Sequence, residues 1–166
     1  MSTVAHGGEH VRLAGQDRYG TAAAVSRDAF PNGSVPVVHV VNGLGFADAL
    51  AAGPAAAVLG GPVLPVATDT IPGVIAAELE RLRPGRIVLV GGAAAVSSEV
   101  EQALGQYTGG GVTRAAGADR YETAAAVALA AFDGPAPQVL LATGEGFADA
   151  LAARSARTPE PSRTLF

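Results

Sequence analysis

The fold is decided by a stretch that occurs twice in the chain: residues 12–25 read RLAGQDRYGTAAAV, and residues 114–127 read RAAGADRYETAAAV. The two stretches lie 102 residues apart and agree at 11 of 14 positions. A second block, GLGFADALAA at residues 43–52, returns as GEGFADALAA at residues 144–153, with an offset of 101 residues. Two blocks that keep nearly the same offset predict the duplication of a structural unit.

The duplication predicts how the chain is divided. We expect a first unit at residues 11–113 and the first half of a second, truncated unit at residues 114–153, because the repeat stops after the second block. The tail at residues 154–166 matches nothing upstream and is expected to be flexible. A length of 166 residues fits one domain or one and a half small units, which excludes a large multidomain enzyme.

Composition excludes several classes of protein. Apolar residues make up 49% of the chain and charged residues only 16%, which favours a globular core over disorder. The net charge is −4 and all eleven cations are arginines, so the charge argues against nucleic-acid binding. The absence of cysteine excludes disulfides, thiolate zinc sites and cysteine nucleophiles. The chain contains no run of about 18 apolar residues, so no membrane span is predicted. The first ten residues do not resemble a signal peptide.

Short apolar runs alternate with longer alanine-rich segments. The short runs are predicted strands and the longer segments predicted helices. Because the strands are apolar throughout and alternate with helices, we predict an α/β fold with an open, mainly parallel sheet covered on both faces. The predicted strands are residues 35–41, 63–66, 86–90 and 139–142, and the predicted helices are residues 19–30, 47–59, 72–82, 98–104, 121–132 and a short one from residue 148.

Capping residues support the predicted helix starts. Asp17 and Asp119 precede the two repeated helices as N-caps, and Glu122 completes a capping box with Asp119. Ser98 and Glu101 show the same spacing and predict a third capped start. Part of the repeated motif is therefore explained as the start of a helix.

The turn at residues 43–46 follows a predicted strand and opens a helix, which is where a dinucleotide-binding turn would lie. Its third glycine is replaced by Asp48, and by Asp149 in the second copy. A carboxylate there stabilises the helix start but would repel a pyrophosphate. Asp69 is the candidate ribose-binding acid. We favour helix stabilisation and keep a small nucleotide-dependent enzyme as the alternative.

Other chemistry-bearing patterns are weak. The chain contains neither a Gly-x-Ser-x-Gly elbow nor a His-Glu-x-x-His pair. His6 and His10 have metal-binding spacing only in a helix, and the two glycines between them disfavour one. His39 lies in an apolar strand, which favours a satisfied core histidine over a base. We therefore expect no catalytic residue, no metal site and no cofactor.

Arg18 and Arg120 each follow an aspartate cap at the start of a helix. A cation there is unfavourable to the helix dipole unless it meets a carboxylate or an external anion. Two interpretations remain open at this point. The arginines either contact an anionic ligand or form an arginine–aspartate fork that braces the loop.

Together these motifs resemble the cell wall binding repeat 2 family. The resemblance is carried by residues 12–22, 46–54, 62–65 and 87–97, and it runs from about residue 12 to residue 153. Modules of that family occur in tandem on secreted proteins of Gram-positive bacteria. The resemblance implies a Rossmann-like α/β module, located in the cell wall or outside the cell, that anchors its host by binding anionic secondary wall polymers. It also implies that any catalysis belongs to a separate domain.

The resemblance further implies candidate polysaccharide-binding residues and partners. The arginine of the family's Asp-Arg-Tyr motif falls on Arg18 and Arg120. The implied partners are an anionic cell-wall polymer and further copies of the module, or self-association. The family's apolar segment, near the contact between modules and the proposed ligand groove, falls on Pro62, Val63, Leu64 and Pro65, and the second copy lacks it.

Overall fold

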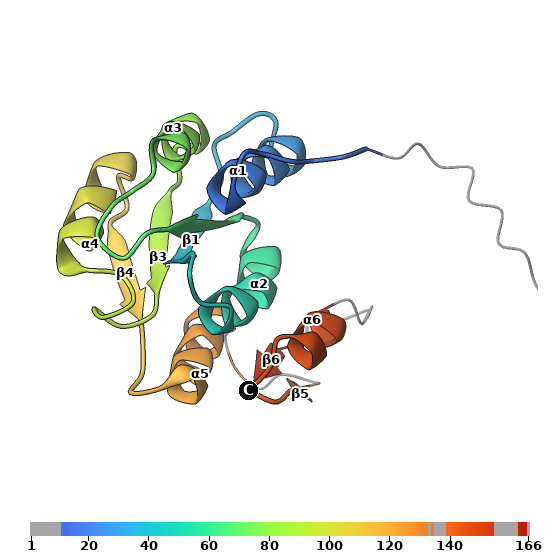
Figure 1. The fold of residues 1–166 in the computed structure, drawn as a ribbon. Coiled ribbons are helices and arrows are strands. Elements are labelled where there is room, and N and C mark those ends of the chain that lie inside the picture. Colours follow the sequence, from blue (N-terminus) through green and yellow to red (C-terminus); the bar gives the residue numbers. More distant parts are fainter. Residues whose placement is uncertain (1–10, 133, 135–138, 155–162, 166) are drawn as a thin grey trace, which may run out of the picture.

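The computed structural model describes residues 11–132, 134, 139–154 and 163–165. Its centre is a parallel sheet of four strands in the order β2-β1-β3-β4 (Figure 1). A second, two-stranded parallel sheet pairs β5 with β6. The α/β prediction is confirmed. The strands are β1 (Val37–Asn42), β2 (Val63–Val66), β3 (Arg86–Val90), β4 (Val112–Ala115), β5 (Val139–Leu141) and β6 (Arg163–Leu165).

Helices alternate with these strands as the sequence predicts, and their observed bounds lie within one residue of the predicted ones. Two strands were not predicted. β4 contains Thr113 and Arg114, which interrupt its apolar pattern, and β6 lies in the tail expected to be flexible. The helices are α1 (Arg18–Ala29), α2 (Ala47–Leu59), α3 (Gly73–Leu82), α4 (Ser98–Leu104), the 3₁₀ turn η1 (Gly105–Tyr107), α5 (Arg120–Ala131) and α6 (Ala148–Arg154).

Helices cover both faces of the four-stranded sheet (Figure 1). On one face, the side chains of Val38, Val40 and Leu89 pack with apolar residues of α3 and α4, and α1 lies on the same side. On the other face, Val37 and Val41 pack against alanines of α2 and against Val127 of α5. All six residues of β1 are buried, as expected for a central strand of a parallel sheet.

The second copy of the repeat packs against the first. α5 lies 102 residues after α1 at both ends, and it contacts α2, as does α6 (Figure 1). β4 extends across the expected boundary between residues 113 and 114, because it completes the first sheet beside β3. The repeated stretch that opens the second copy is thus tied to the first through its strand.

The helix caps follow the predicted pattern with two corrections. The Glu122 carboxylate accepts the N–H of Ala118 at 2.9 Å rather than that of Asp119. The Asp17 carboxylate accepts the backbone N–H of Gly20 at 2.7 Å, and Asp119 caps α5 in the same way. The prediction that Ser98 caps α4 is wrong by one residue. Ser97 has the extended backbone that a cap requires, and its hydroxyl accepts the N–H of Val100 at 3.3 Å.

Candidate functional site

The two repeated blocks meet each other in both copies. The Arg18 Nη1 donates to the carbonyl oxygen of Gly43 at 2.5 Å, and the Arg120 Nη1 donates to that of Gly144 at 2.6 Å. Each arginine therefore braces the turn that precedes α2 or α6. The acceptor is a backbone carbonyl in the other block rather than the neighbouring aspartate.

A tyrosine ring packs against each of these arginine–carbonyl contacts. We call the arginine, the glycine and the tyrosine of each copy a joint. A Cβ added to Gly43 would lie 2.9 Å from Cε1 of Tyr19, and one added to Gly144 would lie 2.6 Å from Cε1 of Tyr121. Both distances are shorter than carbon atoms tolerate, so the ring occupies the space that a side chain would need. The two blocks recur together because each holds the other in place.

The glycine of the first block is also required because a side chain would not fit there. The N–H of Gly15 donates to Oγ1 of Thr21 at 3.1 Å, and that of Gly117 donates to Oγ1 of Thr123 at 3.0 Å. A Cβ on either glycine would lie 2.2 Å from an atom of the following helix. Much of the repeated motif is therefore a joint between loop, helix and turn.

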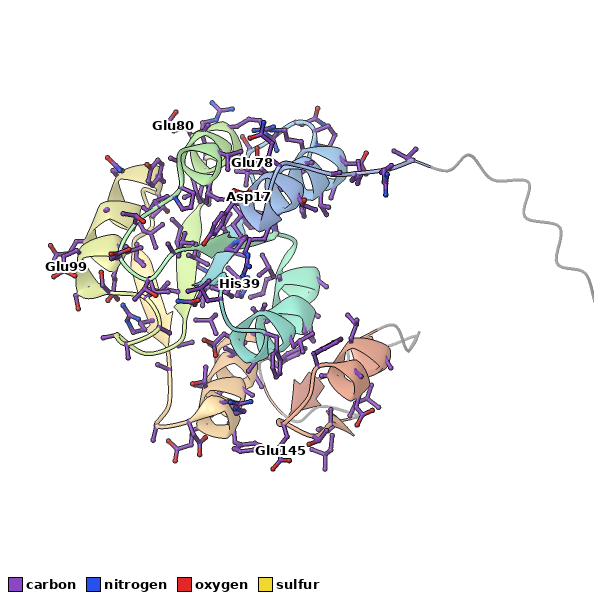
Figure 2. All side chains as sticks on the ribbon, viewed as in Figure 1. Asp17, His39, Glu78, Glu80, Glu99 and Glu145 are labelled. Atoms are coloured by element: carbon purple, nitrogen blue, oxygen red, sulfur yellow. The ribbon has the colours of Figure 1, made fainter. Side chains whose placement is uncertain are left out.

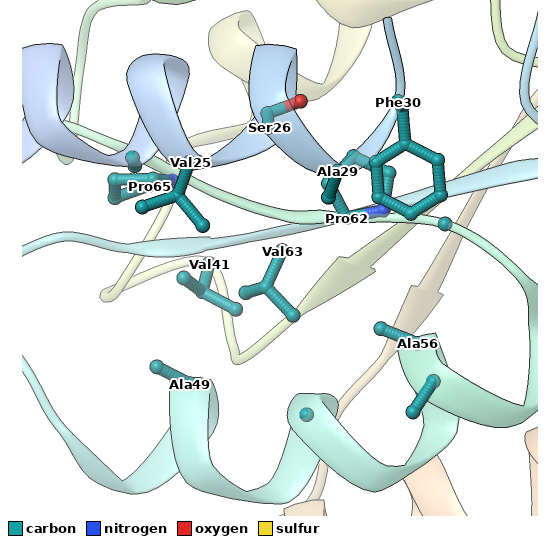
Figure 3. A pocket seen from close by; sticks show the side chains of 14 residues that line it. Val25, Ser26, Ala29, Phe30, Val41, Ala49, Ala56, Pro62, Val63 and Pro65 are labelled. Atoms are coloured by element: carbon teal, nitrogen blue, oxygen red, sulfur yellow. The ribbon is translucent and has the colours of Figure 1, made fainter. Parts of the chain in front are cut away.

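The predicted apolar segment lies on the edge strand β2. Pro62, Val63 and Pro65 line a groove of about 440 Å³ between α1 and α2, and Figure 3 shows Val63 in its floor. Leu64 points to the opposite side and is fully buried in the core. None of the described residues that line the groove is charged. The structure brings three of the four predicted residues together and separates the fourth.

The Arg18 joint borders this groove, because a Cβ on Gly43 would lie 3.3 Å from Cβ of Pro65, whereas no residue of the Arg120 joint lines the groove. Arg120 lies at the carboxyl-terminal edge of the sheet, where the loops after β1, β3 and β4 meet, and Arg18 reaches the loop after β1 from the start of α1. At that edge lies a second hollow of about 460 Å³, lined by Asp48, Gly91, Asp119, Arg120 and small residues of the same loops. The exposed carboxylate of Asp69, predicted as a ribose-binding acid, is not part of its lining.

The Asp48 side chain lies at the turn where the pyrophosphate of a nucleotide would have to bind. A Cβ on Gly91 would lie 2.6 Å from Oδ2 of Asp48, so the carboxylate covers the turn after β3. Its burial raises the pKa of the carboxyl group, and the charge of Arg120 opposes this shift. A pyrophosphate placed at this turn would approach a carboxylate.

Sequence reasoning missed Asn42, the last residue of β1. Its Nδ2 donates to Oγ1 of Thr68 at 3.1 Å and to the carbonyl of Ala95, and its Oδ1 accepts the N–H of Leu44 at 2.6 Å. This amide joins the loops that follow β1, β2 and β3 and so shapes the edge of the sheet. The available signal was an asparagine directly before a glycine at the end of a strand.

Glu78 was also missed. Its carboxylate is fully buried, yet it accepts hydrogen bonds from Ser26, Arg27 and Arg81 at 2.6–3.1 Å (Figure 2). Burial alone would raise the pKa of Glu78, but the hydrogen bonds from Arg81 and Ser26 and the two positive charges lower it overall. The cluster fastens α3 to α1 beside the groove. Glu78 and Arg81 lie one helical turn apart, but Ser26 and Arg27 precede Glu78 by 52 and 51 residues, so the sequence alone did not suggest the cluster.

His39 is buried at the centre of β1, as predicted for a core histidine (Figure 2). Its Nδ1 has no hydrogen-bond partner among the described residues, so the expectation that it is satisfied is wrong. Burial, with a smaller contribution from the charge of Arg86, lowers the pKa of His39 to about 4. His6 and His10 lie outside the described residues. Within the described part of the chain, no three histidine or acidic side chains gather as a metal site would require.

The fold and the joint that occurs in both copies define a class of protein: a small α/β module that is repeated along the chain. A family model described as "Cell wall binding domain 2" matches residues 12–101 and 114–159. The chain belongs to this family. It is a cell wall binding module of the type found on Gram-positive surface proteins.

Two curated proteins of Bacillus subtilis (strain 168) are similar to it. The N-acetylmuramoyl-L-alanine amidase LytC is 33% identical over 139 residues, which are 84% of this chain and 27% of LytC. The amidase enhancer is 34% identical over 143 residues, covering 85% of this chain and 19% of the enhancer. The chain thus spans about a quarter or less of the length of these relatives.

Two solved structures from Clostridium difficile share the fold. Cwp8 matches with a TM-score of 0.85 and 29% identity, over 92% of this chain and 26% of Cwp8. Cwp6 matches with a TM-score of 0.76 and 30% identity, over 90% of this chain and 25% of Cwp6. No helix in the part of the chain that the structure describes is both long and apolar enough to cross a membrane.

Proposed function

We propose that this chain is a non-catalytic anchoring module that holds its host at the cell wall, or in the extracellular space beside it, by binding an anionic secondary wall polymer. Membership of the cell wall binding family supports the anchoring role. The proposal includes the division into a unit at residues 11–113 and a half unit at residues 114–153. The main support for an anionic ligand is that the guanidinium groups of the two repeated arginines are held in position but form no ion pair with a described residue.

Arg18 and Arg120 are held in place without being neutralised. Each guanidinium donates one N–H to a backbone carbonyl, and both residues are exposed. Within the described residues neither forms an ion pair within 4 Å, whereas Arg27, Arg81 and Arg114 all do. A fixed guanidinium with unused donors matches a phosphate or carboxylate of a polymer.

The groove beside β2 suits an uncharged part of the same polymer. The N–H of His39 donates to Pro62 and that of Gly43 donates to Val66, so alternate residues of β2 pair with β1. Val63 and Pro65 therefore turn their backbone to the free edge, where Pro65 has no N–H to offer. The edge offers mainly carbonyl acceptors, which suit the hydroxyl groups of a saccharide.

Further copies of the module, or self-association, are the second proposed partner. Leu141 and Leu151 of the second copy are 78% and 52% exposed. Apolar side chains of this size gain free energy when another surface covers them.

The alternative, a nucleotide-dependent enzyme at residues 43–46, has less support. Asp48 places a carboxylate in the hollow where a pyrophosphate would have to bind.

Co-sedimentation with purified Gram-positive cell walls tests the proposal. We expect the wild-type chain to be retained, and Arg18→Ala and Arg120→Ala each to lower retention several-fold because a fixed cation is lost. The remaining binding should weaken as salt is added, since screening reduces exposed charge interactions. Arg83→Asn is the matched control, because it removes an exposed arginine that lines neither hollow while keeping a residue suited to its left-handed backbone. Equal retention of all four proteins would contradict the role of the two arginines.

A further inference from the structure

The hollow at the carboxyl-terminal edge of the sheet has the position of a ligand site. It is lined by the loops after β1, β3 and β4 and has a volume of about 460 Å³. The chain leaves β1 toward β2 on one side and returns to β3 on the other, so the connections diverge between β1 and β3. Ligands of open parallel sheets bind in the crevice at this switch point. We name this hollow the switch-point crevice.

Both copies of the repeat contribute to this crevice. The first copy supplies Phe46 and Asp48 from the start of α2, and the second supplies Asp119 and Arg120 from the start of α5. The guanidinium carbon of Arg120 lies 5.8 Å from the centre of the Phe46 ring, and the Phe46 ring meets that of Phe147 edge-on at 6.2 Å. A cation–π contact thus fixes one wall.

The acidic groups in the crevice have acceptor capacity that the protein leaves unused. Asp48 is partly buried and receives no hydrogen bond from any described residue. One oxygen of Asp119 accepts the N–H groups of Tyr121 and Glu122, and its second oxygen is outside this cap. An ionised carboxylate can accept from both oxygens, so these acids call for a ligand that donates.

The rest of the lining restricts the shape and charge of that ligand. Gly91, Gly92, Ala94 and Ala95 leave an open floor, and Leu44 and Phe46 give the rim an apolar surface. A phosphate inside the crevice would lie against the carboxylate of Asp48, which is unfavourable. Hydroxyl groups above a small-residue floor, with one ring face on an apolar rim, satisfy the whole lining.

We propose that the switch-point crevice binds an uncharged, hydroxyl-rich sugar ring of the wall polymer, with Asp48 accepting hydrogen bonds from ring hydroxyls and Arg120 donating at the rim. This inference rests on the proposed function and names the part of the polymer that enters. The anionic groups of the same polymer stay outside the crevice, next to Arg18, which is exposed and is not part of the lining.

The test uses Asp48→Asn, which keeps the size of the side chain and removes its charge. If a sugar ring binds, the variant should lose wall retention at least five-fold, because an amide accepts hydroxyls less strongly than a carboxylate does. If a phosphate binds there, the same variant should be retained more strongly, since a repulsive charge is gone. Stronger or unchanged retention therefore overturns the inference.

Asp149→Asn is the matched control. Asp149 has the same place in the repeated block and is exposed on α6, outside the crevice, so its replacement should leave retention unchanged. An equal loss in both variants would assign the effect to a helix start and overturn the inference. Thermal unfolding of both variants checks that they remain folded.

A second measurement separates this inference from the proposed function. If wild-type chain is not retained by walls, the proposed function fails. Neutral oligosaccharides released from the wall polymer by removing its phosphate are then titrated into the ¹⁵N-labelled chain. Shifts of the Gly91 and Gly92 amides that are absent with inorganic phosphate or ATP support the sugar site. No shift, or a shift with ATP alone, overturns it.

Discussion

The two copies of the repeat form the same joints but bury different amounts of surface. α1 and α5 each have 12 residues, an aspartate cap and an arginine bound to a glycine carbonyl. Val40 in β1 is fully buried, whereas Leu141, at the corresponding position 101 residues later, is 78% exposed. β1 lies between two partner strands, and β5 pairs with β6 alone among the described strands. The repeated motif therefore specifies the joint, whereas the neighbouring strands decide how much of each strand is buried.

The largest expected effect concerns His39, whose counterpart in the second copy is Leu140. The folded pKa of His39 is about 4, below its ordinary value of 6.5, so the unfolded chain binds a proton that the folded chain refuses. Stability should therefore fall as the pH drops from 6.5 to 4, by about 3 kcal/mol. His39→Leu should remove this part of the pH dependence, as measured by urea unfolding at several pH values.

The wild-type chain and His39→Leu must be compared at each pH. Glu78 also has a lowered pKa, so its stabilisation is lost in acid in both proteins. An identical decline in the two proteins would assign the acid sensitivity to carboxylates and not to His39.

The next largest effect on stability is expected from shortening a buried side chain of β1, in contrast to an exposed side chain of β5. Val40→Ala should cost about 2 kcal/mol, because it removes two buried methyl groups and leaves a cavity. Leu141→Ala should change the free energy of unfolding by less than about 0.5 kcal/mol, as expected for an exposed side chain. Chemical denaturation measures both. A large effect of Leu141→Ala would show that β5 is covered in solution, which would favour self-association.

A smaller effect separates the two glycines of each turn. Gly43→Ala and Gly144→Ala should each cost about 1–2 kcal/mol, because the new Cβ would displace a tyrosine ring. Gly45→Ala and Gly146→Ala should be nearly neutral, since nothing lies within 4 Å of a Cβ at either position. Thermal unfolding of the four variants measures this contrast. Equal losses within a pair would contradict the ring contact.

The smallest effect compares the two arginines. Arg18→Ala should cost less than about 1 kcal/mol, because one exposed hydrogen bond is lost. Arg120→Ala should cost about 0.5–1 kcal/mol more, since it also removes the cation–π contact with Phe46. Unfolding both variants in urea measures the difference. A greater loss for Arg18→Ala would show that the wall of the switch-point crevice does not depend on Arg120.

Local sequence patterns were sufficient to predict the helices, four of the strands and the two aspartate caps. They were insufficient for β4, because its two adjacent polar residues, Thr113 and Arg114, leave no apolar run, and the strand forms at the sheet edge by pairing with β3. They also misplaced the cap of α4, since two adjacent serines offer the same side chain and only the backbone conformation distinguishes them. Of the four candidate residues on this segment, Pro62, Val63 and Pro65 line one groove, whereas the alternation of side chains along a strand places Leu64 in the core.

The duplication, the α/β class and the aspartate caps follow from the amino-acid sequence alone, because they depend on a repeated pattern or on residues close together in the chain. The acceptors of Arg18 and Arg120 do not, since each lies 24 or 25 residues away. Only the tertiary structure decided which strands are covered, that Asn42 ties three loops together, and that Asp48 and Arg120 from different copies share one crevice. The Asn42 contacts with Thr68 and Ala95 span 26 and 53 residues, and Asp48 and Arg120 lie 72 residues apart. The sheet order that creates such contacts is set by the packing of the whole core, which no local pattern encodes.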